Sequence, residues 1–283
     1  MKRILGAAVS FTLVGVLTFV LLELVPGDVS AQRLGATSSD AARASLREAL
    51  GLTGSASTRG LRYLSHVARL DLGRSLVDGR DVRAKIAERL PSTALLAIVA
   101  LLVTWAMALP LALRRRRLLV LTLAYALPVP AVALGLLQLG APYGASFGAL
   151  VCAALALQPL LVPRTHGQLA RALDEALGSD ALRTLRAAGA SPSRLLRAAL
   201  RTHALRLVTL VALQLPALLS GVVLVESIFG VPGLGLLAFD ALAARDVPTL
   251  LGLVLVGAAI TIGCTLAVDL VAPRLDPRLD HAA

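Results

Sequence analysis

Long runs of residues without a charged side chain alternate with short charged segments along this chain. Runs that are long enough for one helix each occupy residues 4–22, 91–113, 207–225 and 247–268. A helix needs about 20 apolar residues to cross the hydrocarbon core of a membrane. A fifth run, 118–163, is too long for one crossing, and the turn-forming sequence Gly140-Ala-Pro-Tyr-Gly144 divides it in two. The pattern therefore predicts an all-α membrane protein with six transmembrane helices.

The composition agrees with a lipid environment. Hydrophobic residues make up 57% of the chain and the mean hydropathy is +0.80, both far above the values of a soluble domain. The net charge is +11, but aromatic residues are only 3% and do not alternate with basic ones, which argues against nucleic acid as a partner. Cys152 and Cys264 lie inside apolar stretches, where cysteine acts as a small hydrophobic residue.

Basic residues in the short segments between the runs fall on one side of such a membrane protein, whereas segment 25–90, on the other side, exceeds the length of about 60 residues to which the rule applies. Lys2 and Arg3 precede the first run, four arginines occupy 114–117, and segment 164–206 holds eight more. Positive residues in short loops mark the cytosolic side, so both termini are predicted to be cytosolic. The predicted organisation is a first transmembrane helix (1–24), an extracytoplasmic segment (25–90) and a core (91–283) with five transmembrane helices and a cytosolic coupling loop (164–206).

The N-terminal region has an alternative interpretation as a signal peptide, cleaved after Val29-Ser-Ala31, but its apolar run is longer than the usual 7–15 residues.

The extracytoplasmic segment 25–90 is too short and too poor in large apolar residues to form its own core. Within it we expect Pro26-Gly27-Asp28 to end the first helix, residues 40–50 to form a helix capped by Ser38 or Ser39, and Leu70-Asp-Leu-Gly-Arg-Ser75 to form a turn.

The cytosolic loop contains a pattern more regular than a linker. Asp180-Ala-Leu-Arg-Thr-Leu-Arg-Ala-Ala-Gly189 consists largely of strong helix formers and ends in a glycine. Leu182 and Leu185 share one face of this predicted helix, and Arg183 and Arg186 lie on another. Gly189 suits the position after the last turn, where a left-handed conformation is needed. Ser191-Pro192 then begins a second helix.

Two interpretations of this helical pair remain open from the pattern alone. It could lie on anionic lipid headgroups as an amphipathic surface element. It could instead insert into a groove of a protein partner, because Ala187, Ala188 and Gly189 allow close backbone approach.

The chain resembles the inner-membrane permease subunits of binding-protein-dependent ABC importers of the dipeptide, oligopeptide and nickel class. The helix at 180–189 resembles the EAA-type motif of these proteins. Further elements of the resemblance, in order, are Pro26-Gly27-Asp28, Leu50-Gly-Leu52, Asp71-Leu-Gly-Arg-Ser75, Arg89-Leu-Pro-Ser-Thr93, His203-Ala-Leu-Arg206, Glu226-Ser-Ile-Phe-Gly-Val-Pro-Gly-Leu-Gly235, Arg245-Asp-Val-Pro248, Asp269 and Asp276-Pro-Arg278. The chain departs from the family in having Thr53-Gly-Ser after Leu52, where Asp-Gln-Pro is usual.

The resemblance implies a type I ABC importer permease fold in the inner membrane of a prokaryote. It implies a homologous permease subunit, two ATPase subunits and an extracytoplasmic substrate-binding protein as partners, with peptides or nickel chelates as cargo. The residues implied in coupling to the ATPase are Asp180, Arg183, Thr184, Arg186, Ala187, Ala188 and Gly189. The turn that resembles the outer gate loop of the family would contain Glu226, Phe229, Pro232, Gly233 and Gly235, and its alternative interpretation is a tight reversal at the membrane surface. Glu226 lies at the end of a predicted span, where we favour a role in capping this turn over direct contact with the substrate.

Chemical motifs for other functions are incomplete. Gly144-Ala-Ser-Phe-Gly148 matches the pattern of a serine nucleophile, but the four histidines lie outside the predicted spans, so we interpret it as a helix–helix packing site rather than an intramembrane protease. The chain has neither a P-loop nor a Cys/His cluster, and we expect no cofactor, no metal and no catalysis. The alternative function is a stand-alone secondary transporter, against which the charge-free span centres argue.

Overall fold

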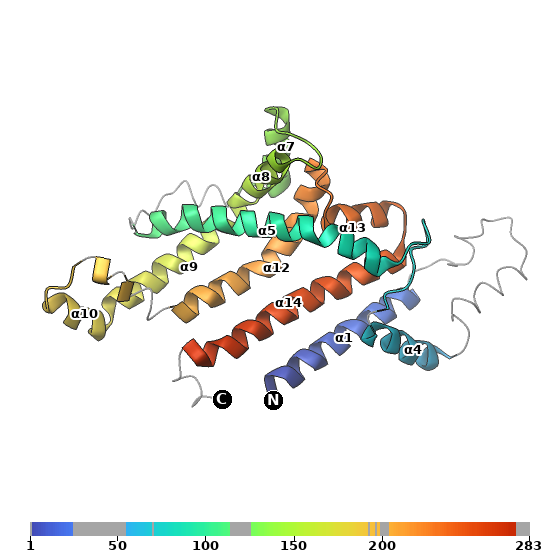
Figure 1. Ribbon diagram of the computed structural model, residues 1–283, viewed down its shortest axis with the longest axis horizontal. Coiled ribbons are helices and arrows are strands. Elements are labelled where there is room, and N and C mark those ends of the chain that lie inside the picture. Colours follow the sequence, from blue (N-terminus) through green and yellow to red (C-terminus); the bar gives the residue numbers. More distant parts are fainter. Residues whose placement is uncertain are drawn as a thin grey trace, which may run out of the picture. The chain divides into compact units, whose positions relative to one another are not determined.

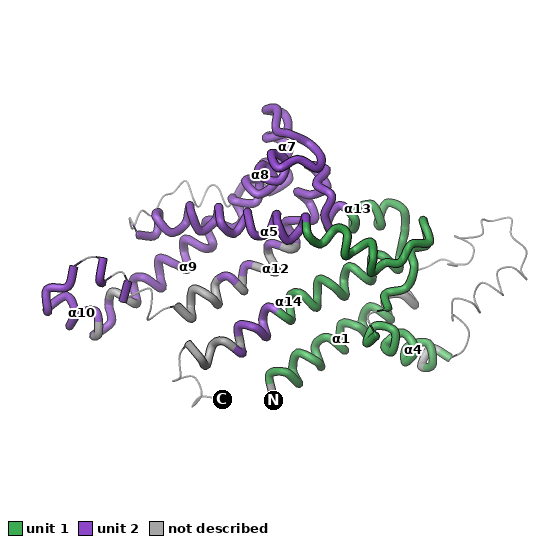
Figure 2. Tube along the Cα trace, viewed as in Figure 1, with its two compact units in different colours: residues 1–91, 237–263 green, residues 92–236, 264–283 purple. Residues whose placement is uncertain are grey.

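The computed structural model describes residues 2–24, 55–69, 71–113, 126–191, 193–195, 197–198 and 204–275. Among these residues the elements are helices, apart from one isolated antiparallel bridge between Arg74 and Asp81. The chain forms two compact units, coloured in Figure 2. Unit 1 comprises residues 1–91 and 237–263, and unit 2 comprises residues 92–236 and 264–283.

Figure 1 labels the helices. Their bounds are α1 Lys2–Leu24, α4 Ala56–Ala68, α5 Val82–Leu113, α7 Val129–Gln138, α8 Phe147–Ala156, α9 Gln158–Gly178, α10 Asp180–Ala187, α12 Ala204–Phe229, α13 Leu234–Ala243 and α14 Val247–Leu275. The divisions between the two units fall inside α5, α13 and α14.

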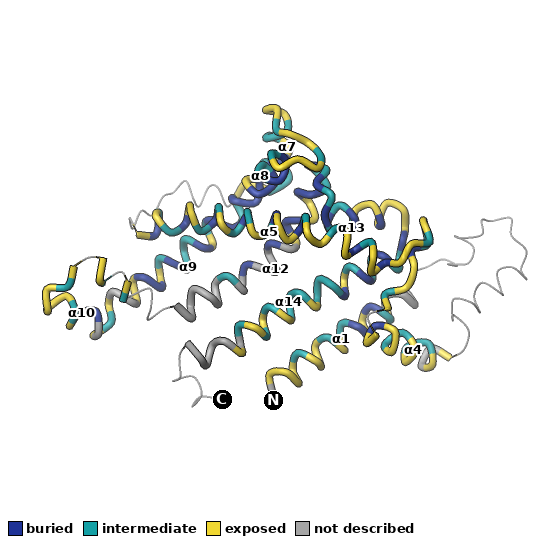
Figure 3. Tube along the Cα trace, in the orientation of Figure 1, coloured by how far each residue is buried: buried dark blue, intermediate teal, exposed yellow. Residues whose placement is uncertain are grey.

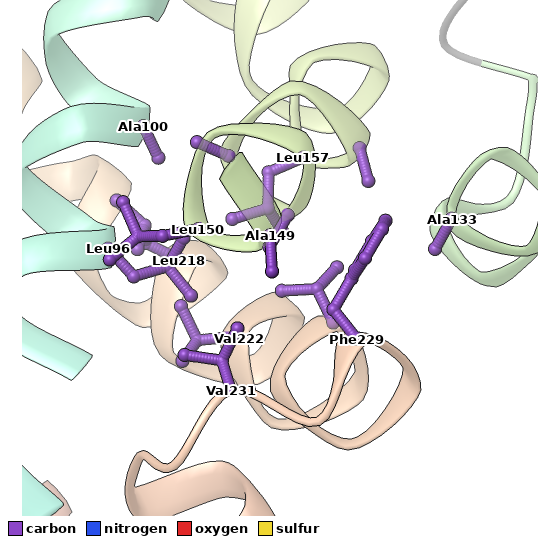
Figure 4. Close-up of a cluster of buried hydrophobic side chains, with 14 of the residues drawn as sticks. Leu96, Ala100, Ala133, Ala149, Leu150, Leu157, Leu218, Val222, Phe229 and Val231 are labelled. Atoms are coloured by element: carbon purple, nitrogen blue, oxygen red, sulfur yellow. The ribbon is translucent and has the colours of Figure 1, made fainter. Parts of the chain in front are cut away.

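The core of unit 2 is built around α12, which packs against α7, α8 and α9. Leu218, Val222 and Phe229 of α12 are buried together with side chains of α5, α7 and α8 (Figure 4). Many of the partners on α8 are alanines, which allow helices to approach closely where no hydrophobic driving force from water is present. The Gln158 side chain at the start of α9 accepts a hydrogen bond from Thr104 of α5 at 2.9 Å, so a polar contact also joins these helices.

In unit 1, α4 packs against the C-terminal half of α1 (Figure 1). A side chain on Gly60 would touch the ring of Phe19, and one on Gly15 would touch Leu64, so these glycines allow the close contact. Tyr63 donates a hydrogen bond of 3.1 Å to the buried hydroxyl of Thr18. Ser55 caps the first turn of α4 by accepting from the Thr58 amide.

Three helices are long and apolar enough to cross a membrane, or up to five if each of two bent helix pairs forms one span. The single spans lie in α1, α5 and α14. The bent pairs are α8 with α9, at 54°, and α12 with α13, at 77°. The predicted third span falls partly on residues 114–125, outside the described part of the chain, and its described part contains α7, a helix of 10 residues.

The structure corrects several local predictions. The predicted fourth span is not one helix, because it breaks at Leu157 before Pro159, which has no amide hydrogen to continue α8. Segment 164–206 does not begin as a loop, since α9 continues to Gly178. Arg164 therefore marks a change of composition rather than a helix end. The turn predicted at 70–75 is described from Asp71 on, where the Gly73 amide donates to the Asp71 carboxylate at 3.0 Å and Gly73 has a φ of 78°, and a further turn follows at 76–78. The predictions for residues 26–28 and 38–50 lie outside the described residues.

Candidate functional site

The first candidate site is α10, whose two ends are fixed by local hydrogen bonds. The Ser179 hydroxyl caps the first turn by accepting from the Leu182 amide. At the other end, the Ala190 amide donates to the Leu185 carbonyl and the Gly189 amide donates to the Arg186 carbonyl, both at 3.1 Å. This pair of bonds is a Schellman motif, which requires a left-handed residue after the helix. Gly189 supplies it with a φ of 76°.

The predicted helix at 180–189 and the role of Gly189 at its end are thus confirmed in the backbone. Our prediction for Gly189 allowed either a positive φ or a close contact. The structure shows the positive φ, and a Cβ at Gly189 would meet nothing within 4 Å. Glycine is therefore needed here for backbone conformation, because other L-residues pay a steric cost in the left-handed region.

One face of α10 packs against its own subunit, and the residues implied in coupling lie on the exposed remainder. Leu182 is buried and packs against Leu195 and Ala198 of the segment that follows, as the apolar pattern predicts. All the residues implied in coupling are exposed: Asp180, Arg183, Thr184, Arg186, Ala187, Ala188 and Gly189 (Figure 3). The helix therefore presents a surface with two arginines, one carboxylate and a tip of small residues.

The second candidate site is the turn between α12 and α13, which forms around the carboxylate of Glu226. This side chain is 0% exposed. Its Oε2 accepts hydrogen bonds from the amides of Gly235 at 2.6 Å and Leu236 at 3.4 Å, in the first turn of α13. Its Oε1 accepts from the Thr93 hydroxyl at 2.8 Å. Glu226 thus caps α13, as predicted, and its negative charge is favourable at the helix N-terminus.

The glycines of this turn leave room for that carboxylate. A Cβ on Gly233 would overlap the Glu226 carboxylate, and a Cβ on Gly235 would overlap the Val223 backbone. Gly230 has a φ of 66°, which ends α12. The run of glycines predicted from the sequence as a tight reversal is therefore required by close packing and backbone geometry.

The neighbouring turn at 140–146 is joined to the same region. The Gly144 amide donates to the Phe229 carbonyl at 2.8 Å, and a Cβ on Gly230 would overlap the Tyr143 ring. Our interpretation of Gly144–Gly148 as a helix–helix packing site is wrong. Ser146 caps α8 by accepting from the Ala149 amide, and Gly148 approaches Pro142 of the preceding turn. No hydrogen bond between Ser146 and a histidine occurs among the described residues.

Sequence reasoning gave Thr93 and Ser179 no role, although both position a candidate site. Thr93 is 5% exposed, and besides donating to Glu226 its hydroxyl accepts from the Leu234 amide at 2.7 Å. It lies in Arg89-Leu-Pro-Ser-Thr93, one of the elements that carry the family resemblance, but its partner is far away in the sequence. Ser179 had a local signal, because serine directly before a run of helix formers is typical of an N-cap.

Comparison with known proteins assigns the chain to a family. Residues 97–281 match the family described as binding-protein-dependent transport system inner membrane component, and residues 1–97 match its N-terminal component. The chain belongs to this family. A glutathione transport system permease protein of Salmonella paratyphi A is 32% identical over 99% of this chain and 98% of its own length. A putative peptide transport system permease protein of Brucella suis biovar 1 is 29% identical over the same shares.

Family membership confirms the predicted class. The protein is a permease subunit of an ABC importer with the all-α type I permease fold, and it is a transport subunit rather than an enzyme. The alternatives of a stand-alone secondary transporter and an intramembrane protease do not agree with the match over nearly the whole chain.

Proposed function

We propose that this permease subunit imports peptides, and that it works in the cytoplasmic membrane with both termini in the cytosol. The relatives named above are permease proteins of peptide and glutathione transport systems, and glutathione is itself a small peptide. The remaining parts of the importer would be a homologous permease, two ATPase subunits and an extracytoplasmic substrate-binding protein.

In this proposal α10 is the element that contacts an ATPase subunit. The observation that carries it is the division of α10 into a buried Leu182 and an exposed surface that contains every residue implied in coupling. The exposed tip of small residues, Ala187, Ala188 and Gly189, allows the backbone of a protein partner to approach closely. A protein groove is therefore favoured over a lipid surface.

Motion of the ATPase would reach the membrane through α10 as a rigid element. Leu182 ties α10 to Leu195 and Ala198, and the segment containing these residues leads toward α12. Displacement of α10 by ATP binding would therefore bias the permease between inward-open and outward-open states. At the far end of α12, the turn around Glu226 would serve as the outer gate.

Site-specific photocrosslinking tests the ATPase contact. A photoreactive amino acid at Ala187, in the exposed tip, should crosslink to the ATPase in the assembled complex. The matched control places the photoreactive amino acid at Arg171, which is exposed on α9, and should give little crosslink. A crosslink from both positions, or from neither, would contradict the assignment of α10 as the docking element.

A further inference from the structure

The turn between α13 and α14 in unit 1 has an unusual backbone. Arg245 adopts a positive φ of 54°, a conformation that residues with a Cβ avoid unless their surroundings hold them there. The Asp246 amide donates to the Ala241 carbonyl at 2.7 Å and the Arg245 amide to the Leu242 carbonyl at 3.2 Å. This is again a Schellman end, but with arginine where glycine is usual. Something outside the turn must offset its strain.

The carboxylate of Asp246 provides such an anchor. Asp246 is 1% exposed. It accepts hydrogen bonds from the Ser75 hydroxyl at 2.5 Å, the Leu76 amide at 3.0 Å and the Thr249 hydroxyl at 2.6 Å. Its Oδ2 also lies 3.7 Å from Lys85 Nζ. A buried carboxylate with this set of donors holds one arrangement firmly, because loss of its charge leaves several donors without an anion.

Two of these donors, Ser75 and Leu76, belong to a loop that is folded tightly on itself. Ser75 is 0% exposed, and its amide donates to the Arg80 carbonyl at 2.9 Å. Lys85 Nζ lies 3.0 Å from Asp78 and donates to the Ser75 hydroxyl at 3.2 Å. Asp246 is therefore attached to a preformed loop at 73–81 rather than to a single flexible side chain.

We propose that Asp246 is a positioning residue of the transport cycle, which holds the strained Arg245 turn and so fixes the end of α13. The inference rests on the proposed function, in which α13 follows the outer gate turn. Glu226 fixes the first turn of this helix, and Asp246 fixes the residues that follow its last turn. Without Asp246 the strained turn relaxes, and the gate no longer responds fully to the binding protein.

The test uses the complete complex in lipid nanodiscs and measures ATP hydrolysis with and without the binding protein. The ratio of these two rates reports coupling and does not depend on the fraction of active complex. Asp246→Asn should lower the ratio by at least about 5-fold, the lower end of typical coupling between two sites. Asp240, an exposed carboxylate on α13, provides the matched control, and Asp240→Asn should leave the ratio unchanged.

Relief of the strain at Arg245 distinguishes a positioning role from a general loss of structure, because only a positioning role predicts that the hydrolysis ratio recovers. In the Asp246→Asn background, Arg245→Gly should restore most of the ratio, because glycine adopts the left-handed conformation without cost. An unchanged ratio in Asp246→Asn, or no recovery with Arg245→Gly, would overturn the inference. Should Asp246→Asn fail to assemble, Thr249→Val decides instead, with a smaller reduction expected and no reduction overturning the inference.

The outcome is separable from that of the proposed function. Absence of the Ala187 crosslink in the wild-type complex would overturn the ATPase assignment of α10. A normal crosslink together with an unchanged hydrolysis ratio in Asp246→Asn would overturn only the role of Asp246.

Discussion

Thr93 and Glu226 are 133 residues apart in the sequence and are joined by a buried hydrogen bond of 2.8 Å. The same hydroxyl accepts the Leu234 amide at 2.7 Å, so Thr93 both donates to the carboxylate and completes the cap of α13. A single threonine thus links α5 to the turn that we propose as the outer gate.

Thr93→Val should destabilise unit 2, because it leaves the partly buried Leu234 amide and the buried Glu226 carboxylate each without one partner. The expected loss is about 1–3 kcal/mol, seen as a lower thermal midpoint of the purified protein in detergent. Thr12→Val is the matched control, since the Thr12 hydroxyl is exposed and donates to the Ala8 carbonyl of its own helix. Equal midpoints for Thr93→Val and wild type would show that the cap contributes little.

Gly233→Ala should have an effect of similar size by a different route. The added methyl group would overlap the Glu226 carboxylate, and overpacking of this kind costs about 1–3 kcal/mol. Gly135→Ala, inside α7 with nothing within 4 Å of its Cβ position, should be neutral or slightly stabilising. If both variants unfold at the wild-type temperature, the turn is less tightly packed around Glu226 than the structure indicates.

The predicted orientation can be tested by labelling single cysteines in intact cells, after Cys152 and Cys264 have been replaced. Val77→Cys, in an exposed turn of the 25–90 segment, should react with a membrane-impermeant maleimide. Ser193→Cys, exposed beyond α10, should react only after the cells are opened. Labelling of Ser193→Cys from outside would reverse the topology.

The anchor around Asp246 should weaken in acid. Burial alone raises the pKa of Asp246, but hydrogen bonds from Ser75, Thr249 and Leu76 and the charge of Lys85 lower it overall. Burial also raises the pKa of Asp78, but hydrogen bonds from Lys85 and Ser75 outweigh it and lower this pKa to about 2. A lowered pKa in the folded state stabilises the fold above the unfolded value of about 3.9 and ceases to do so as the pH falls through the folded value.

Thermal midpoints of wild type and Asp246→Asn, measured from pH 7 down to pH 3, test whether the stabilisation by Asp246 is lost in acid. The difference between them should be constant at neutral pH and should shrink below a pH of about 4. A difference that grew in acid would mean that Asp246 is bound in its protonated form.

Local patterns in the sequence were sufficient for the helix at 180–189, because its leucine spacing, arginines and terminal glycine all act within one or two turns. The same holds for Glu226, which caps a turn only nine residues away. Hydrogen bonds between residues far apart in the sequence were not predictable in this way. Ser75 and Asp246 each lie in a recognisable element, but 171 residues separate them and no local rule relates them.

The break at Leu157 had a signal that was missed. Pro159 lies within a charge-free run, and a proline is tolerated in the first turn of a helix but not in its interior, so a new helix is expected to begin near it. The side-chain Nε2 of Gln158 donates to the Ala154 carbonyl at 2.7 Å, so a side-chain hydrogen bond supports the backbone at the break.

The measurement that tests the coupling account most directly is recovery of the ATPase with the purified permease, together with transport, for two variants of Gly189. Valine in the left-handed conformation costs about 1–2 kcal/mol, whereas asparagine tolerates it. Gly189→Val should reach the membrane normally but recover less ATPase and transport far less than wild type. Gly189→Asn should behave nearly as wild type, and Arg171→Ala should have little effect. Normal transport and normal ATPase recovery by Gly189→Val would contradict the account, and α10 would then be better assigned to the lipid surface.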